Sequence, residues 1–258
     1  MPLFAVEGSE LMLLIGKFWW PFVRFSALLW SMPMFDGPYV TPRARILLAA
    51  SLALLVATTT ITVPAVDPLS IESMVMTLEQ IVLGVLLGLA IRILFGVATL
   101  TGTIVSMQMG LAMAVMMDPG NDQAPLVSQL FWLVASLCFL GLDGHLIVLA
   151  VATDSFQLWP IGTSLYHLQL GAIIELFGWM FTAALLVSLP AIITMLLVNM
   201  TFGVASRAAP SLNIFVLGFP VTLLLGLIPI LLMVYQLGEH FFNFTEYVLF
   251  AMRRVLEG

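Results

Sequence analysis

Long stretches without a single charged residue dominate this chain, and short clusters of Pro, Gly, Asp and Arg separate them. The longest uncharged stretches cover residues 46–66, 93–117, 123–142, 176–206 and 208–238. A helix needs about 20 apolar residues to cross the hydrocarbon core of a bilayer, and each stretch reaches that length. The strands of a membrane barrel would instead alternate polar and apolar residues. The pattern therefore predicts an all-α, polytopic membrane protein that forms a single integral membrane domain over residues 1–258.

The breaks between the apolar stretches predict about six long helices, several of them kinked. The expected helices cover residues 11–31, 46–63, 76–100, 126–142, 172–200 and 214–237. Pro190, Pro220 and Pro229 fall inside the last two, where a proline removes a backbone hydrogen bond and bends the helix. Ser70 has the side chain of a helix cap and stands shortly before the third helix. Residues 241–256, apolar and then basic, predict an amphipathic tail after the sixth helix.

Residues 101–117 differ from the other apolar stretches because Gly, Thr, Ser and Met dominate them. Five methionines lie close together here: Met107, Met109, Met113, Met116 and Met117. A helix would place Met109, Met113 and Met116 on one stripe, but the glycines predict a departure from regular helix. Ordinary core packing is one interpretation of these methionines. The other is a deformable seal, because Met is unbranched and adapts to irregular surfaces.

Composition narrows the class of protein further. Hydrophobic residues make up 62% of the 258 residues and charged residues only 9%, which is more apolar surface than a water-soluble fold of this size buries. The basic residues form no patch, which argues against nucleic-acid binding. His145, His167 and His240 lack metal-ligand spacing, and Asp143-Gly144-His145 is typical of a turn. We therefore expect no catalytic residues, no metal, no cofactor and no enzymatic activity.

The few charged residues inside apolar segments are the main candidates for function, because such charges are costly in a membrane. They are Lys17, Arg24, Glu79, Arg92 and Glu175. One hypothesis is a small secondary transporter that uses Glu79, Arg92 and Glu175. The alternative is structural, with ion pairs or side chains that extend to the membrane surface. Glu79 and Arg92 lie 13 residues apart, about 20 Å along a helix, so each needs a partner elsewhere.

Several motifs coincide in the second half of the chain. The block Arg207-Ala208-Ala209-Pro210-Ser211-Leu212-Asn213, followed by Gly218-Phe219-Pro220, resembles the signature of the FliR family of export proteins. Weaker matches extend the resemblance over nearly the whole chain: Pro33, Pro38, Pro42 to Arg45, Glu79 with Gly84 and Gly88, residues 110–119, Asp143-Gly144-His145, Ser155, Pro160, Asn199 and Gly203. The resemblance favours the flagellar branch over the virulence branch, whose members are called SctT.

The resemblance implies a core membrane subunit of the flagellar type III protein export gate. FliR-like proteins assemble with several copies of FliP and FliQ, with FlhB nearby, and the assembly exports unfolded flagellar subunits. It lies in the bacterial inner membrane at the centre of the flagellar basal body. Family members resemble a FliP-like portion, here residues 1–205, fused to a FliQ-like portion, here residues 206–258, and their helices do not follow ordinary membrane topology.

The resemblance also implies roles for two sets of residues. In the family, a methionine-rich ring from FliP and a plug loop from FliR seal the central constriction. The expected plug residues here are Met109, Gly110, Met113, Met116 and Met117. The expected subunit interface contains Glu79, Arg92, Arg207, Pro210 and Asn213, because a charge in so apolar a setting needs a partner group. A solvated loop at the membrane face is the alternative for Arg207.

Overall fold

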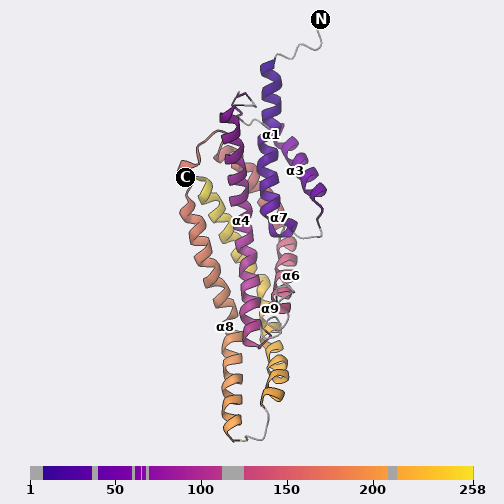
Figure 1. Cartoon of the computed structure of the whole chain (residues 1–258), viewed down its shortest axis with the longest axis vertical. Coiled ribbons are helices and arrows are strands. Elements are labelled where there is room, and N and C mark those ends of the chain that lie inside the picture. The colour runs from indigo at the N-terminus through magenta and orange to yellow at the C-terminus, as the bar shows by residue number, and fades with distance from the viewer. Residues whose placement is uncertain are drawn as a thin grey trace. The chain divides into compact units, whose positions relative to one another are not determined.

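The computed structural model describes residues 8–36, 40–59, 62–64, 66–67, 70–111, 125–208 and 214–257. These residues form helices joined by turns, with no strand among them (Figure 1). The helices are α1 (Gly8–Ser31), α2 (Pro33–Asp36), α3 (Pro42–Ala57), α4 (Ile71–Gln108), α6 (Leu126–Gly141), α7 (Gly144–Leu158), the 3₁₀ helix η1 (Leu165–His167), α8 (Leu170–Ala208) and α9 (Ile214–Glu257). The all-α architecture is confirmed.

Within the described part of the chain, four helices are long and apolar enough to cross a membrane. They are Met12–Ser31, Ile71–Gln108, Leu170–Ala208 and Pro220–Val255, and the bent pair α6 and α7 adds a fifth if it counts as one span. The length and apolar character of these helices agree with the polytopic membrane protein that the charge gaps predict.

Caps and turns explain where several helices begin and end. The hydroxyl of Ser70 accepts a hydrogen bond from the backbone N–H of Ser73 at 3.1 Å, which confirms the predicted cap of α4. The Thr41 hydroxyl accepts from Ala44 N–H at 3.4 Å, and Pro42 occupies the first turn of α3. Because of this cap, α3 begins at Pro42 and not at the expected residue 46. The helix ends at Ala57, before the expected residue 63.

The prediction that regular helix ends near residue 100 is wrong, because α4 continues to Gln108. Its threonines do not disrupt it, since the Thr103 hydroxyl donates to the carbonyl of Thr99 at 2.9 Å, one turn earlier. The helix ends at Gly110, whose φ is 78°. The N–H groups of Gly110 and Leu111 donate to the Met107 and Ser106 carbonyls at 3.1 Å and 3.0 Å, which is the Schellman arrangement at a helix C-terminus.

The prediction that the last helix ends at residue 237 is also wrong, because α9 runs without a break over Ile214–Glu257. Glu239 and His240 are exposed on the helix surface and leave its backbone hydrogen bonds intact. Pro220 and Pro229 lie inside this helix, and Pro190 lies inside α8. A few charged residues on an exposed face therefore do not interrupt a helix in this chain.

The chain divides into two compact units. Unit 1 contains residues 1–93, 144–176 and 247–258, and unit 2 contains residues 94–143 and 177–246. In unit 1, α1 and α3 pack side by side as an antiparallel hairpin (Figure 1). The first part of α4 runs parallel to α1.

Two glycines allow the close approach of α4 to α1 in unit 1. A Cβ atom at Gly84 would overlap the Arg24 carbonyl oxygen and lie 2.7 Å from the Cβ of Ala27. A Cβ atom at Gly88 would overlap the Ser31 hydroxyl and lie 2.8 Å from the Leu28 carbonyl oxygen. Small residues at these two positions let the helix backbones meet, as in other packed membrane helices.

Unit 2 has its own core around Phe95 of α4. The Phe95 ring contacts Trp132 and Phe139 of α6 and Phe241 of α9, at centroid distances of 6.2 Å, 5.5 Å and 5.9 Å. Near the end of α4, the hydroxyls of Thr103 and Ser128 lie 2.9 Å apart and share a hydrogen bond. These contacts join α4, α6 and α9 within unit 2.

We expect Gly84→Leu to lower the free energy of unfolding by about 1–3 kcal/mol, because a larger side chain forces α4 away from α1. The measurement is unfolding of the purified protein in detergent, followed by far-UV circular dichroism. Gly178→Leu is the matched control, because nothing lies within 4 Å of a Cβ atom at Gly178. Equal stability of the two variants would contradict the close packing of α1 and α4.

Candidate functional site

A buried arginine joins three segments of unit 1. Arg24 of α1 is only 1% exposed. Its Nε donates to the Gln80 side-chain oxygen of α4 at 2.8 Å, and its Nη1 donates to the Ser155 hydroxyl of α7 at 2.8 Å. Its Nη2 donates to the backbone carbonyl of Trp159 at 3.2 Å. The planar guanidinium thus presents its donors to three acceptors from different parts of the chain.

Neutral groups surround the charge of Arg24. Its guanidinium carbon lies 4.0 Å from the centroid of the Phe156 ring, which gives a cation–π contact. The Ser155 hydroxyl, which accepts from Arg24, donates its own proton to the Ala152 carbonyl at 2.6 Å. Among the described residues, no carboxylate pairs with Arg24. The arrangement holds the buried guanidinium through hydrogen bonds to three acceptors, as expected of a structural cation.

The charge pattern predicts Arg24 as an intramembrane charge, but its partners cannot be predicted from the sequence. Gln80 lies 56 residues away along the chain and Ser155 lies 131 residues away. The signal in the sequence is Gln80, a polar residue inside an apolar helix. It is easily overlooked because it directly follows the charged residue Glu79.

The three charges of the transporter hypothesis do not form a common site. Glu79 is half-buried and makes no hydrogen bond or ion pair with a described residue. Arg92 donates from Nε to the Ser31 carbonyl at 3.1 Å. Glu175 lies 3.6 Å from Arg254 in a solvent-exposed ion pair. Across the described residues, no group of three or more His, Cys, Asp or Glu side chains is placed to hold a metal ion.

The methionines near the end of α4 have different environments. Met109 is 2% exposed and Met107 is 60% exposed. In unit 2, Met109 packs onto Gly226 of α9, where a Cβ atom would lie 2.6 Å from the Met109 methyl carbon. The Thr222 hydroxyl donates to the Met109 carbonyl at 3.5 Å. The expected plug residues Met113, Met116 and Met117 lie outside the described residues.

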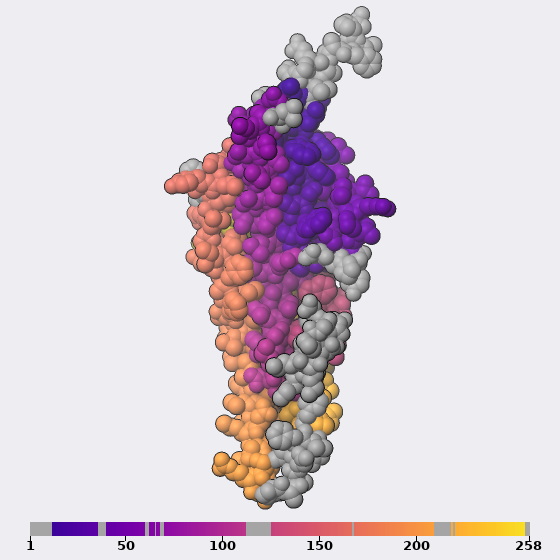
Figure 2. Space-filling view, viewed as in Figure 1, coloured from indigo at the N-terminus to yellow at the C-terminus, as the bar shows by residue number. Residues whose placement is uncertain are grey.

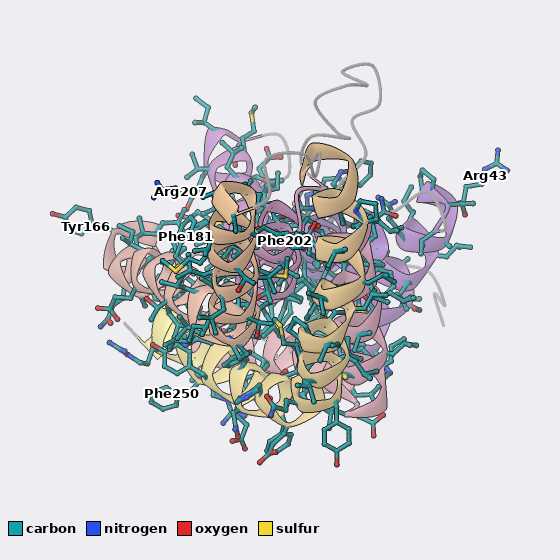
Figure 3. The ribbon with its side chains drawn as sticks, turned by 90° about the horizontal axis from the view of Figure 1, so that it is seen from below. Arg43, Tyr166, Phe181, Phe202, Arg207 and Phe250 are labelled. Atoms are coloured by element: carbon teal, nitrogen blue, oxygen red, sulfur yellow. The ribbon has the colours of Figure 1, made fainter. Side chains whose placement is uncertain are left out.

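Two other sequence motifs have defined positions. Arg207 is exposed in the last turn of α8 and its side chain points away from the helix (Figure 3). Pro210 and Asn213 lie outside the described residues. Asp143 adopts a φ of 54° and its N–H donates to the Leu140 carbonyl at 3.1 Å. Asp143 therefore lies in the turn between α6 and α7, as predicted, but Gly144 and His145 already begin α7.

The surface of unit 2 carries a large exposed apolar face on α8. Figure 2 shows α8 in orange as a continuous band on the surface. Large apolar side chains recur along it: Phe181, Leu185, Leu186, Leu189, Ile193, Leu196, Leu197, Met200 and Val204 are all exposed. A continuous apolar surface of this size is covered by lipid or by another protein.

These observations first define a class of protein: an all-helical, polytopic membrane protein. It contains a buried arginine held by neutral groups, and α8 carries a long apolar surface. Comparison with known proteins narrows this class. The family model for bacterial export proteins, family 1, matches residues 15–248.

Curated relatives agree with this match. The chain is 34% identical over 235 residues to the flagellar biosynthetic protein FliR of Pectobacterium carotovorum subsp. carotovorum, covering 89% of each chain. It is 30% identical over 226 residues to FliR of Escherichia coli (strain K12), covering 86% of this chain and 85% of the relative. It is 27% identical over 230 residues to FliR of Aquifex aeolicus (strain VF5), covering 87% and 89%. The chain belongs to the family of bacterial export proteins that contains FliR, which confirms the resemblance seen in the motifs.

We expect Arg24→Met to lower the free energy of unfolding by about 3 kcal/mol, because it leaves three buried acceptors unpaired. Arg24→Lys keeps the charge but loses the planar fork, so an intermediate loss is expected. Unfolding in detergent measures both variants. Arg253→Met is the control, because Arg253 is exposed on α9. A loss for Arg24→Met no greater than that for Arg253→Met would show that Arg24 is not a structural cation.

Proposed function

We propose that this chain is a non-enzymatic core subunit of the flagellar type III protein export gate. In this role it assembles with several copies of FliP and FliQ, with FlhB nearby, and helps to form the conduit for unfolded flagellar subunits. The family match supports the export role, and the names of the relatives support the flagellar system. The gate would lie in the bacterial inner membrane at the centre of the flagellar basal body.

The observation that carries the proposal is the length of the uncharged part of α8. Residues 176–206 contain no charge, and these 31 residues extend about 46 Å as a helix. The hydrocarbon core is about 30 Å thick. A helix of 46 Å would need a tilt of about 49° to fit, which exceeds the usual range of about 0–40°. Part of the exposed face of α8 is therefore expected to be covered by protein, as in a hetero-oligomeric assembly.

The proposed subunit interface includes Glu79, Arg92, Arg207, Pro210 and Asn213. Arg207 supports the idea best, because it is an exposed cation at the end of the apolar face of α8. Its guanidinium is available to an acidic side chain or to helix carbonyls of a neighbouring subunit. Glu79 supports it as well, because a half-buried carboxylate without a partner among the described residues needs one from another chain.

The proposed pore plug begins at Gly110, where α4 ends. The buried position of Met109 against Gly226 suits an anchor for the plug rather than a part of its surface. We therefore assign the seal itself to Met113, Met116 and Met117, with Gly110 as the turn that leads the chain out of α4. Flexible thioether side chains would close the pore at rest and yield when an unfolded subunit passes.

The charges inside apolar segments also suggest a small secondary transporter. It would require Glu79, Arg92 and Glu175 to act on one substrate or proton path. Glu79 and Arg92 lie about 20 Å apart along α4, and Glu175 pairs with Arg254 at the surface. The geometry of unit 1 gives these charges no common site, so the export role is the better proposal.

Co-purification tests the export role. We expect this chain, tagged and expressed with FliP and FliQ from the same organism, to elute from detergent as one large complex that native mass spectrometry resolves. Arg207→Ala should reduce the recovered complex several-fold, because one charge-assisted contact is lost. Arg253→Ala, a second exposed arginine, should have no effect. A stable lone monomer beside well-expressed partners would refute the proposal, and an intact Arg207→Ala complex would refute the interface role.

Ion conductance tests the plug. We expect the combined change Met113→Ser, Met116→Ser and Met117→Ser to raise small-ion leakage through the assembled complex, because short polar side chains cannot seal an apolar constriction. Met107→Ser is the matched control, since Met107 is exposed before the end of α4. Conductance equal to that of the unmodified complex, with assembly verified, would rule out a methionine seal.

A further inference from the structure

A groove runs between α1 and α4 on the surface of unit 1. Its volume is about 520 Å³, and it is lined by Trp30 and Ser31 of α1 and by Ile81, Val85, Leu89 and Arg92 of α4. The groove exists because α1 and α4 are parallel and their backbones meet at Gly84 and Gly88. The large side chains on either side of this contact form the walls of the groove.

The groove is apolar along most of its length and cationic at one end. Ile81, Val85 and Leu89 follow one another at four-residue spacing, so they line one face of α4. Arg92 continues the same face, and its Nε donates to the Ser31 carbonyl at 3.1 Å, which holds the guanidinium at the end of the groove. A ligand that matches this gradient has an apolar body and a negative head.

Other groups at the same end strengthen the match. Trp30 is 59% exposed, and its ring centroid lies 5.4 Å from the guanidinium carbon of Arg45. Arg43 lies two residues earlier in α3 and its side chain points outward (Figure 3). The charges in residues 31–45 together with Arg92 are three arginines and Asp36, which sum to +2. Tryptophan and arginine together are typical of the membrane–water interface.

We propose that this groove binds one anionic phospholipid, with its phosphate at Arg92 and an acyl chain along Leu89, Val85 and Ile81. Ile81 and Arg92 lie eleven positions apart, about 17 Å along the helix, close to the thickness of about 15 Å of the hydrocarbon in one leaflet. Arginine binds phosphate oxygens in a bidentate fashion. Basic pockets between membrane helices recognise such headgroups, and anionic lipids are concentrated in the cytoplasmic leaflet.

The charge at one end of the groove favours an anionic lipid over an apolar helix of a partner protein, because such a helix offers no anion to the guanidinium of Arg92. An extended acyl chain is much thinner and fits between the two helices. Bound lipid at Arg92 is compatible with a neighbouring subunit covering it, so the inference does not depend on the proposed export role.

Lipid titration of the purified, delipidated full chain tests the inference by native mass spectrometry. Phosphatidylglycerol and phosphatidylcholine with identical acyl chains serve as probes. We expect one phosphatidylglycerol to bind at least about tenfold more tightly than phosphatidylcholine, as one charge-assisted contact allows. Arg92→Gln should weaken phosphatidylglycerol binding about tenfold and leave phosphatidylcholine binding unchanged. Val85→Trp should weaken both, because it fills the apolar part of the groove.

Arg253→Gln is the control for a general loss of positive charge and should bind both lipids like the unmodified chain. Equal binding of the two lipids, or unchanged phosphatidylglycerol affinity in Arg92→Gln, would overturn the inference. If Arg92→Gln instead detached a subunit from the co-purified complex without changing lipid affinity, the occupant would be a protein and the lipid site would be wrong. Arg92 is exposed, so the Gln variant is expected to fold.

Discussion

The guanidinium of Arg24 is the interaction on which the packing of unit 1 depends. It holds α1 to α4 through Gln80 and to α7 through Ser155, and a backbone carbonyl and an aromatic ring complete its surroundings. A cation without a carboxylate partner in the core is costly unless every nearby acceptor is well placed. The parallel contact of α1 and α4 at Gly84 and Gly88 brings those acceptors close enough. The hydrogen bonds and the backbone contact therefore require each other, and the groove on the outer side of α1 and α4 is a consequence of both.

The sequence predicts the fold well where the signal is local and poorly where it is long-range. Charge gaps locate the apolar helices, Ser70 marks the start of α4, and Asp143 marks a turn. The end of α4 is missed because a hydroxyl inside a membrane helix bonds to the preceding turn, as that of Thr103 does. The end of α9 is missed because Glu239 and His240 are exposed on the helix surface and do not interrupt it. The partners of Arg24 are missed because they are distant in sequence. The methionine stripe does not predict that Met109 is buried against Gly226 of α9, because helical spacing gives a direction but not the identity of the neighbouring helix.

The apolar surface of α8 is longer than the hydrocarbon core of a bilayer, so lipid alone does not account for all of it. The hydrocarbon core of a bilayer is about 30 Å thick, and the uncharged part of α8 is longer than this. The exposed side chains along this helix are large and aliphatic or aromatic, with few polar groups to orient a ligand. Such a surface suits broad contact with other apolar helices, where shape and small residues decide the fit.

The short length of α3 has a consequence for biosynthesis. With 16 residues, α3 extends about 24 Å, so it falls short of the hydrocarbon thickness. It returns the chain between two parallel helices, α1 and α4, and it packs against α1. During translation α3 emerges after α1 and before α4, so α1 is the only helix that can shelter it at that stage. This region is therefore expected to insert as a hairpin of α1 and α3. Packing against α1 stabilises α3, which is too short to span the hydrocarbon core alone.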